Sequence, residues 1–299
     1  MPAPLVSVII PVYNAQNYIE QTIRSVLQQT ISDLEVIVMN DGSNDGSEQV
    51  ILTLQKTDAR IRYQAKANSG VSDTRNKGIA IAEGKYVAFL DADDVWMPDN
   101  LEKKIGALAS GGKQWVFSNV EFIDENNKVL PASLHNFKPY DFVNNLLLWE
   151  GDVVPGPCSN IVVARELLND DVRFDIQLSS PADRDICIQL ALKAEPVYLD
   201  EKLWQYRLHS QSMTSVNKKV IGEVQYFIKK AKTSRWFSDG RIRRKSLSNI
   251  YLMMAGISYK FIGHKMQGIG FLFRSFLYSP HNIWKKKIIH AFNFLKNNH

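Results

Sequence analysis

The sequence predicts an α/β protein with a mostly parallel sheet, helices on both faces of that sheet, and a basic helical region from residue 218 onward. Apolar runs rich in β-branched residues alternate with helix-like stretches through residues 1–120, and polar turns follow three of these runs. The charge then changes sign, because residues 1–217 hold 19 Lys and Arg against 29 Asp and Glu, whereas residues 218–299 hold 17 against 2. We therefore expect two domains, 1–217 and 218–299.

Buried strands are expected where apolar residues run together. These runs cover residues 5–12, 34–39, 60–65, 85–90 and 115–120. Helices are expected between them, over 14–29 with Asn14 as the N-cap, over 47–55, over 72–82 with an end near Gly84, and from Pro98 onward. Residues 130–180 are less regular. A helix over 183–193 and one or two strands within 196–206 complete the first domain.

Composition limits the class of protein and its compartment. Hydrophobic residues make up 45% and charged residues 22% of the chain, which is typical of a folded globular protein. Arg24 is the first basic residue, so residues 1–23 lack the positive region of a signal peptide, and no stretch reaches the length of an uncharged membrane span. Cys158 and Cys187 lie far apart, which favours a reducing compartment. We expect a cytoplasmic protein.

An acidic turn follows the strand expected at 85–90. Asp91, Asp93 and Asp94 place three carboxylates within four residues, an arrangement that is costly without a compensating cation. Carboxylate oxygens suit Mg²⁺ or Mn²⁺, which bridge protein to phosphate oxygens. The plain alternative is a solvated acidic turn in which Asp94 or Asp99 caps the next helix. The turns at 11–14 and 40–43 also follow strands, and ligands of parallel sheets bind at that edge.

Four strings then resemble the family-2 glycosyltransferases, which have the GT-A fold. They are VSVIIPVYN at 6–14, NDGS at 40–43, NSG at 68–70 with RNKG at 75–78, and FLDADD at 89–94. Their order and spacing match over residues 5–100, and a weaker match continues to about 215. The resemblance implies a Rossmann-like mixed sheet flanked by helices, with nucleotide-sugar binding mainly in residues 1–120 and the acceptor side mainly in 121–217. It also implies inverting transfer from a UDP-sugar to a hydroxyl of a glycan or lipid-linked saccharide, as in bacterial surface polysaccharide or lipopolysaccharide synthesis.

The resemblance also implies roles for donor-binding residues. Pro11 and Tyr13 line the nucleotide pocket, with the tyrosine ring against the base. Asp41 accepts a hydrogen bond from the base, and Arg75 lies near the diphosphate. The family usually has an acidic residue where this chain has Asn40.

The metal site follows from the same resemblance. Asp91, Ala92 and Asp93 form the DXD motif, in which Asp93 is the firmer ligand of Mn²⁺ or Mg²⁺ and Asp91 lies nearer the ribose. His209, at the end of the string YRLH at 206–209, completes the metal or diphosphate site. The alternative for His209 is an ordinary surface histidine.

The general base is expected at the start of the helix at 183–193. The resemblance maps the family's catalytic aspartate to Asp183, with Ala182 where the family has Glu. A carboxylate at a helix N-terminus can take the proton of an acceptor hydroxyl. Asp185 is the alternative base. The alternative role for Asp183 is N-capping, because Asp is among the best N-cap residues.

Two other functions remain open from the sequence. A haloacid-dehalogenase-like phosphohydrolase also has Asp-x-Asp after a strand, although there the motif continues into Gly-Thr, and here Asp94 and Val95 follow. A non-catalytic homologue could bind nucleotide or anchor partners at a membrane. The Gln-x-x-Arg-Trp motif of processive synthases is absent from the sequence, which favours single additions.

The basic region 218–299 interleaves charged and aromatic residues, as in 241–245 and 284–287. One helix face within it is expected from the spacing of Leu247, Ile250, Tyr251, Met254, Ser258 and Phe261. Each Lys or Arg near an anionic membrane contributes about 1 kcal/mol. We therefore expect peripheral binding to the inner face of the cell membrane, in preference to nucleic acid. A helical appendage packed on the catalytic domain is the alternative, and the oligomeric state is left open.

Overall fold

The computed structural model describes residues 3–131, 142–149, 153–209, 218–260 and 264–280. The chain divides into two compact units. One comprises Met1–Pro139 with Val154–Ser210, and the other comprises Tyr140–Val153 with Gln211–His299. The segment at 140–153 therefore belongs with the helices that follow residue 217, far from it in the sequence.

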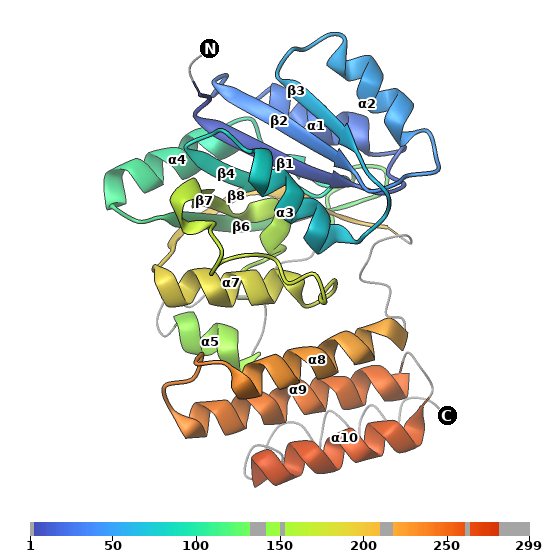
Figure 1. Cartoon of the computed structure of the whole chain (residues 1–299), viewed down its shortest axis with the longest axis vertical. Coiled ribbons are helices and arrows are strands. Elements are labelled where there is room, and N and C mark those ends of the chain that lie inside the picture. Colours follow the sequence, from blue (N-terminus) through green and yellow to red (C-terminus); the bar gives the residue numbers. More distant parts are fainter. Residues whose placement is uncertain (1–2, 132–141, 150–152, 210–217, 261–263, 281–299) are drawn as a thin grey trace. The chain divides into compact units, whose positions relative to one another are not determined.

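The first unit is built on one eight-stranded sheet with the order β3-β2-β1-β4-β7-β6-β8-β5 (Figure 1). The strands are β1 Val6–Val12, β2 Leu34–Asn40, β3 Ile61–Ala65, β4 Tyr86–Phe89, β5 Val95–Trp96, β6 Trp115–Asp124, β7 Val162–Ala164 and β8 Val197–Leu208. The four strands from β3 to β4 pair in parallel. β7 then pairs antiparallel with β4 and β6, β8 runs parallel to β6, and β5 runs antiparallel to β8. The mixed α/β sheet predicted from the resemblance is confirmed, and the parallel part is its N-terminal half.

Helices pack on both faces of this sheet. They are α1 Ile19–Leu27, α2 Ser47–Gln55, α3 Val71–Ile81, α4 Asn100–Gly111, α6 Pro157–Asn160 and α7 Ala182–Lys193, with a 3-10 turn at Arg165–Leu167. The even-numbered residues of β1 share one core with α1, α2 and α4. Ile9, on the other face, meets α3 so closely that a Cβ on Gly78 would lie 2.5 Å from its Cγ2 atom. Alternation along β1 therefore covers both faces with helices.

Helix α1 begins later than predicted. Asn14 has a φ of 52°, in the left-handed region, so it forms a turn, and the helix starts at Ile19 with Tyr18 before it. Asn favours both N-caps and left-handed turns, and the sequence alone does not separate the two. Gly84 is not the helix end either, because α3 ends at Ile81 with Ala82 as its C-cap residue. Gly84 instead lies against β1, where a Cβ would lie 2.5 Å from the backbone nitrogen of Ser7.

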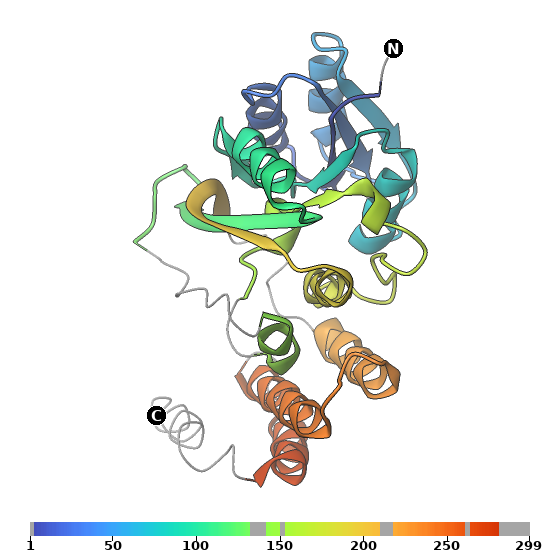
Figure 2. The same ribbon diagram turned by 90° about the vertical axis from the view of Figure 1, so that its left-hand side faces the viewer.

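The second unit is helical, with α5 Phe142–Leu148, α8 Lys218–Thr233, α9 Gly240–Lys260 and α10 Lys265–Tyr278. Figures 1 and 2 show α8, α9 and α10 side by side. The apolar face predicted around Leu247 and Ile250 is buried in this unit, and Asn249 donates a hydrogen bond to the Leu148 carbonyl at 2.6 Å. Residues 261 and 284–287 lie outside the described part. Among the described helices, none combines the length and apolar character needed to cross a membrane.

Candidate active site

Three strand ends meet at one edge of the parallel sheet. β1 and β2 end in register, with Val12 opposite Asn40, and the Asp41 N–H donates to the Val12 carbonyl at 2.8 Å. β4 lies on the other side of β1, and the Leu90 N–H donates to the Ile9 carbonyl at 3.1 Å. The turns after β1, β2 and β4 therefore open at the same edge, as parallel pairing requires.

Tyr13 and Pro11 differ in what they offer a ligand. The Tyr13 side chain is 54% exposed just after β1 and presents its ring to solvent. Pro11 is buried within β1, opposite Met39. Of the two residues predicted to line the nucleotide pocket, only Tyr13 has a surface that a base can stack on.

The Asp41 carboxylate is buried and already holds several donors. Its Oδ1 accepts from the Ser69 N–H at 2.8 Å and from the Lys66 ammonium, and its Oδ2 accepts from the Gly70 N–H at 3.0 Å. An ionised carboxylate has about four acceptor positions, so a base N–H must share this group or displace a donor. Lys66 is the donor that can turn away, because the other two are fixed backbone groups.

The turn at Asp41 depends on a glycine. Gly42 has a φ of 73°, which a residue with a side chain rarely adopts. A Cβ there would also lie 2.9 Å from the Asn68 nitrogen. The glycine lets the turn after β2 lie close to the segment that supplies the donors to Asp41.

Arg75 joins the acidic turn to helix α7. Its side chain is 1% exposed and lies over the Phe174 ring. One guanidinium nitrogen donates to Asp91 Oδ1 at 2.6 Å, and the other donates to Asp183 Oδ1 at 3.1 Å. Burial alone would lower the pKa of Arg75, but the neighbouring carboxylates of Asp91 and Asp183 raise it. The predicted DXD motif and the predicted base thus share one buried cation.

The pKa of Asp91 is set by its burial and by the charged groups around it. Burial, together with the nearby carboxylates of Asp183 and Asp93, raises the pKa of Asp91 to about 6, although Arg75 acts in the opposite direction. The Asp91 N–H donates to the Ser159 hydroxyl at 3.0 Å, which fixes the start of the turn. A second positive charge near Asp91 would favour its ionised form.

Asp93 and His209 form a second pair. His209 Nε2 lies 2.9 Å from Asp93 Oδ2, and the histidine ring packs against Tyr18. The His209 side chain is only 6% exposed, so the surface-histidine alternative is wrong. Ala92, between the two aspartates, is buried, and its carbonyl accepts from the Thr22 hydroxyl at 2.9 Å. Ala92 thus anchors the turn to α1 through its backbone.

Asp94 is bonded to strand β8 rather than to His209. It is buried, its Oδ1 accepts from the Arg207 N–H at 2.9 Å, and burial and the nearby Asp93 and Asp91 raise its pKa well above the usual value. The residue before helix α4 is Asp99, whose side chain makes no capping bond. The solvated-turn alternative therefore does not describe Asp94.

Arg207 is a site residue that the sequence did not single out. Its side chain donates to the Asp93 carbonyl at 2.7 Å, to the Asp124 carbonyl at 3.2 Å and to Gln21 at 2.9 Å. The guanidinium also lies over the Tyr18 ring. These contacts tie the acidic turn to α1, β6 and β8. A basic residue two positions before His209 was the only signal in the sequence.

Asp183 lies in the first turn of α7, with its side chain 31% exposed. The residue before the helix is Pro181, and no side chain caps this end, so Asp183 is not an N-cap. Cys158, another residue the sequence did not assign to the site, donates its thiol to Asp183 Oδ1 at 2.9 Å, and burial raises the pKa of that thiol. Asp185 is fully buried and accepts from Gln189 at 2.6 Å, so it offers no surface to an acceptor.

The residues present fit a divalent cation whose coordination shell is supplied partly by the protein and partly by the phosphate oxygens of a bound donor. Among the described residues, no group of three or more His, Cys, Asp and Glu side chains makes a closed metal cage. Mg²⁺ bound to nucleotides typically takes one or two carboxylates and completes its shell with phosphate oxygens and water. Asp93 Oδ2 and His209 Nε2 face each other and are ligand types that Mn²⁺ accepts. Asp91 is paired with Arg75 instead.

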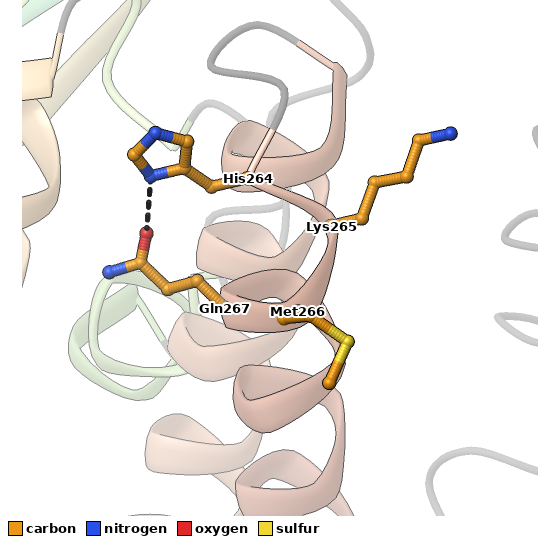
Figure 3. A pocket seen from close by; sticks show the side chains of 4 residues that line it. All are labelled: His264, Lys265, Met266 and Gln267. Atoms are coloured by element: carbon orange, nitrogen blue, oxygen red, sulfur yellow. Dashed lines mark hydrogen bonds between the residues drawn. The ribbon is translucent and has the colours of Figure 1, made fainter.

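A surface hollow in the second unit has a different character. It is lined by four consecutive residues at the start of α10: His264, Lys265, Met266 and Gln267 (Figure 3). One hydrogen bond, of 3.3 Å, joins the His264 ring to Gln267. Among the described residues that line the hollow there is no carboxylate and none of the predicted site residues, so it is not the candidate active site.

Comparison with known proteins agrees with this geometry. The model of the family described as glycosyl transferase family 2 matches residues 7–170. The chain belongs to this family. It is therefore a glycosyltransferase, and the phosphohydrolase alternative is wrong. It is 33% identical over 230 residues to "Putative teichuronic acid biosynthesis glycosyltransferase TuaG" of Bacillus subtilis (strain 168), a match that covers 75% of this chain and 87% of that protein.

Two solved structures show the same fold. The structure of S. aureus TarS 1-349 in complex with UDP-GlcNAc matches with a TM-score of 0.69 at 20% identity, covering 95% of this chain and 83% of that one. The mannosyltransferase PcManGT from Pyrobaculum calidifontis, in complex with GDP-Man and Mn²⁺, matches with a TM-score of 0.59 at 16% identity, covering 95% and 88%. At these identities the likeness shows the GT-A fold.

Proposed function

We propose that this glycosyltransferase moves single sugars from a UDP-sugar to a hydroxyl of a saccharide or lipid-linked acceptor, with inversion at the anomeric carbon. The observation that carries the proposal is the buried Arg75 bridge between Asp91 and Asp183, beside the Asp93–His209 pair. It joins the residues to which we assign phosphate binding and general-base catalysis in one cluster of contacts. The UDP-GlcNAc bound to TarS supports UDP as the nucleotide, and the name of TuaG supports a bacterial surface polysaccharide as the product.

The donor is held by the turns at the sheet edge. Tyr13 stacks on the base, and Asp41 accepts from a base N–H once Lys66 turns toward the diphosphate. The exposed ring of Tyr13, and the fact that Lys66 is the side-chain donor on Asp41, support these roles. Arg75 contributes positive charge close to the diphosphate, and Asp91 contacts the ribose. Ala92 shapes the turn through its backbone.

A divalent cation, Mn²⁺ or Mg²⁺, held by Asp93 and His209 would neutralise the leaving diphosphate. Asp91 contributes to the same negative surface. Because Arg207 fixes the Asp93 carbonyl, the Asp93 side chain stays beside His209 without the donor. This is the preorganisation that stabilisation of developing charge requires.

Asp183 is the general base. Its partly exposed carboxylate takes the proton from the acceptor hydroxyl as that oxygen bonds to the anomeric carbon, while the bond from that carbon to the diphosphate breaks. Arg75 and the Cys158 thiol hold the carboxylate in place. General-base catalysis contributes on the order of 10²–10⁴-fold. Residues 1–120 then serve mainly the donor, and residues 121–217 serve mainly the acceptor.

The basic region 218–299 is proposed to hold the enzyme at the inner face of the cell membrane, where lipid-linked acceptors lie. Its 17 Lys and Arg against 2 Asp and Glu support an anionic surface as partner. Such binding leaves the enzyme cytoplasmic and peripheral.

Calorimetric titration of UDP and GDP, with and without Mn²⁺, tests the donor and the metal. We expect UDP to bind more tightly with Mn²⁺, and Asp93→Ala to remove that gain. Asp183→Asn should retain UDP binding and lose transfer, whereas Asp170→Asn, at a carboxylate that is 91% exposed, should change neither. Full transfer by Asp183→Asn would exclude Asp183 as the base, and Mn²⁺-independent binding of UDP would exclude the proposed metal site.

A further inference from the structure

Helix α10 of the second unit exposes an apolar face. Its buried side is narrow and consists of Gly268, Phe271 and Ser275. Ser275 there donates to the Ser248 carbonyl of α9 at 2.8 Å. Tyr278 at the end of the helix is half-buried against Tyr251. The other positions are exposed and include large apolar side chains between 37% and 80% exposed: Met266, Ile269, Leu272, Phe273, Phe276 and Leu277.

This face differs from the apolar face of α9. The α9 residues Leu247, Ile250 and Met254 are buried within the helical unit and are not available to a partner. The α10 side chains recur at helical spacing along 266–277, so they form one stripe. A stripe of this size on a surface marks an interaction site, because isolated domains rarely leave so many adjacent large apolar side chains in water.

The positive charge around the stripe indicates what kind of surface it binds. Helix α10 contains Lys265 and Arg274 and no acidic residue. Residues 218–280 together hold 13 Lys and Arg against 2 Asp and Glu. A second copy of this chain would bring two such positive units together, which is unfavourable. An apolar stripe with basic flanks complements an anionic lipid surface, in which acyl chains lie beneath negative head groups.

We propose that the exposed face of α10 docks in the interface of an anionic bilayer, with Phe273 and Leu277 among the acyl chains and Lys265 and Arg274 at the head groups. This proposal specifies which helix contacts the membrane, and it rests on the proposed membrane binding of the region 218–299. It does not rest on the donor, the metal or the base.

A fluorescent label tests where the face lies. Cys158 and Cys187 are both buried, so Phe273→Cys provides a thiol that can be labelled selectively with an environment-sensitive dye. Ile176→Cys, at an exposed apolar residue of the first unit, is the matched control. With vesicles of equal parts phosphatidylglycerol and phosphatidylcholine, we expect a blue shift at 273 and none at 176. A dye at 273 that is already shielded and does not respond would show that the chain itself covers this face, and would overturn the proposal.

Binding to the same vesicles tests the energetics. In cosedimentation, Phe273→Asp with Leu277→Asp should weaken binding more than about tenfold, because carboxylates enter the acyl region poorly. Ile176→Asp with Leu192→Asp makes the same charge change at exposed apolar residues of the first unit and should leave binding within about twofold. Equal binding of both double variants, or capture of an acidic protein without lipid binding, would overturn the proposal. UDP binding, measured on each variant, reports the active site separately.

Discussion

Replacing Arg75 with Met deletes the charge that Asp91 and Asp183 share and keeps an unbranched side chain over Phe174. Removing one partner of a buried ion pair costs about 3–5 kcal/mol. The Asp91 and Asp183 side chains keep 26% and 31% of their surface exposed, so water solvates them in part. We therefore expect the free energy of unfolding to fall by about 3 kcal/mol at about pH 8, the lower end of that range.

The loss of unfolding free energy caused by Arg75→Met should be smaller at acidic pH than at about pH 8. The pKa of Asp91 is raised to about 6 in the folded protein, above its usual value of 3.8, so proton binding favours the folded state as the pH falls through this window. Loss of Arg75 raises this pKa further. At about pH 5 Asp91 of the variant is then neutral and needs no counterion. The difference in unfolding free energy between variant and wild type should therefore be smaller at this pH than at about pH 8.

Urea unfolding followed by fluorescence at both pH values measures this difference. Arg75→Lys should lie between wild type and Arg75→Met, because an ammonium does not span two carboxylates as a guanidinium does. Arg173→Met, at an exposed arginine paired with Asp170, should change stability by less than about 0.5 kcal/mol. A stable Arg75→Met, or a cost that is equal at the two pH values, would refute the reasoning.

Three further substitutions test contacts that hold the sheet and the acidic turn in place. Burial raises the pKa of Glu35, but hydrogen bonds from Ser7, the Glu83 N–H and Arg62 lower it overall. Glu35→Gln should therefore cost about 1–2 kcal/mol at neutral pH and nothing in acid below the folded pKa, and a pH-independent cost in urea titrations would contradict this. Gly156→Ala should lower stability by about 3 kcal/mol, because its φ is 41° and a Cβ would lie 2.4 Å from Trp204; an unchanged melting temperature would argue against this contact. Arg207→Met should cost about 3 kcal/mol and weaken Mn²⁺-dependent UDP binding, and calorimetry that shows wild-type binding would disprove its role in holding the acidic turn.

The sequence predicted the parallel half of the sheet well, because β1, β2 and β4 are buried on both faces and read as continuous apolar runs. It missed β5 and β7, which are two and three residues long and have no periodicity. Strands this short exist only because neighbouring strands pair with them, and pairing between distant segments leaves no local signal.

Some residues of the candidate site were likewise predictable from the sequence, whereas the contacts that position them were not. Asp91, Asp93 and Asp183 were predicted from the resemblance, and the structure brings them into one cluster. The position of Arg75 between Asp91 and Asp183 follows from contacts across more than one hundred residues, to α7. The burial of Arg207 depends on α1, β6 and β8 together, and no single stretch of sequence encodes it.

The end of strand β8 gives the acidic turn two fixed points, Arg207 within the strand on the Asp93 carbonyl and His209 just after it beside the Asp93 carboxylate. The turn is made early in synthesis and its supports are made more than one hundred residues later. A nascent chain released before residue 209 therefore has the acidic motif but lacks the parts that orient it. We therefore expect the acidic turn to be oriented only after the last strand along the chain has left the ribosome, and a fragment that ends earlier to lack this orientation even when its parallel strands have formed.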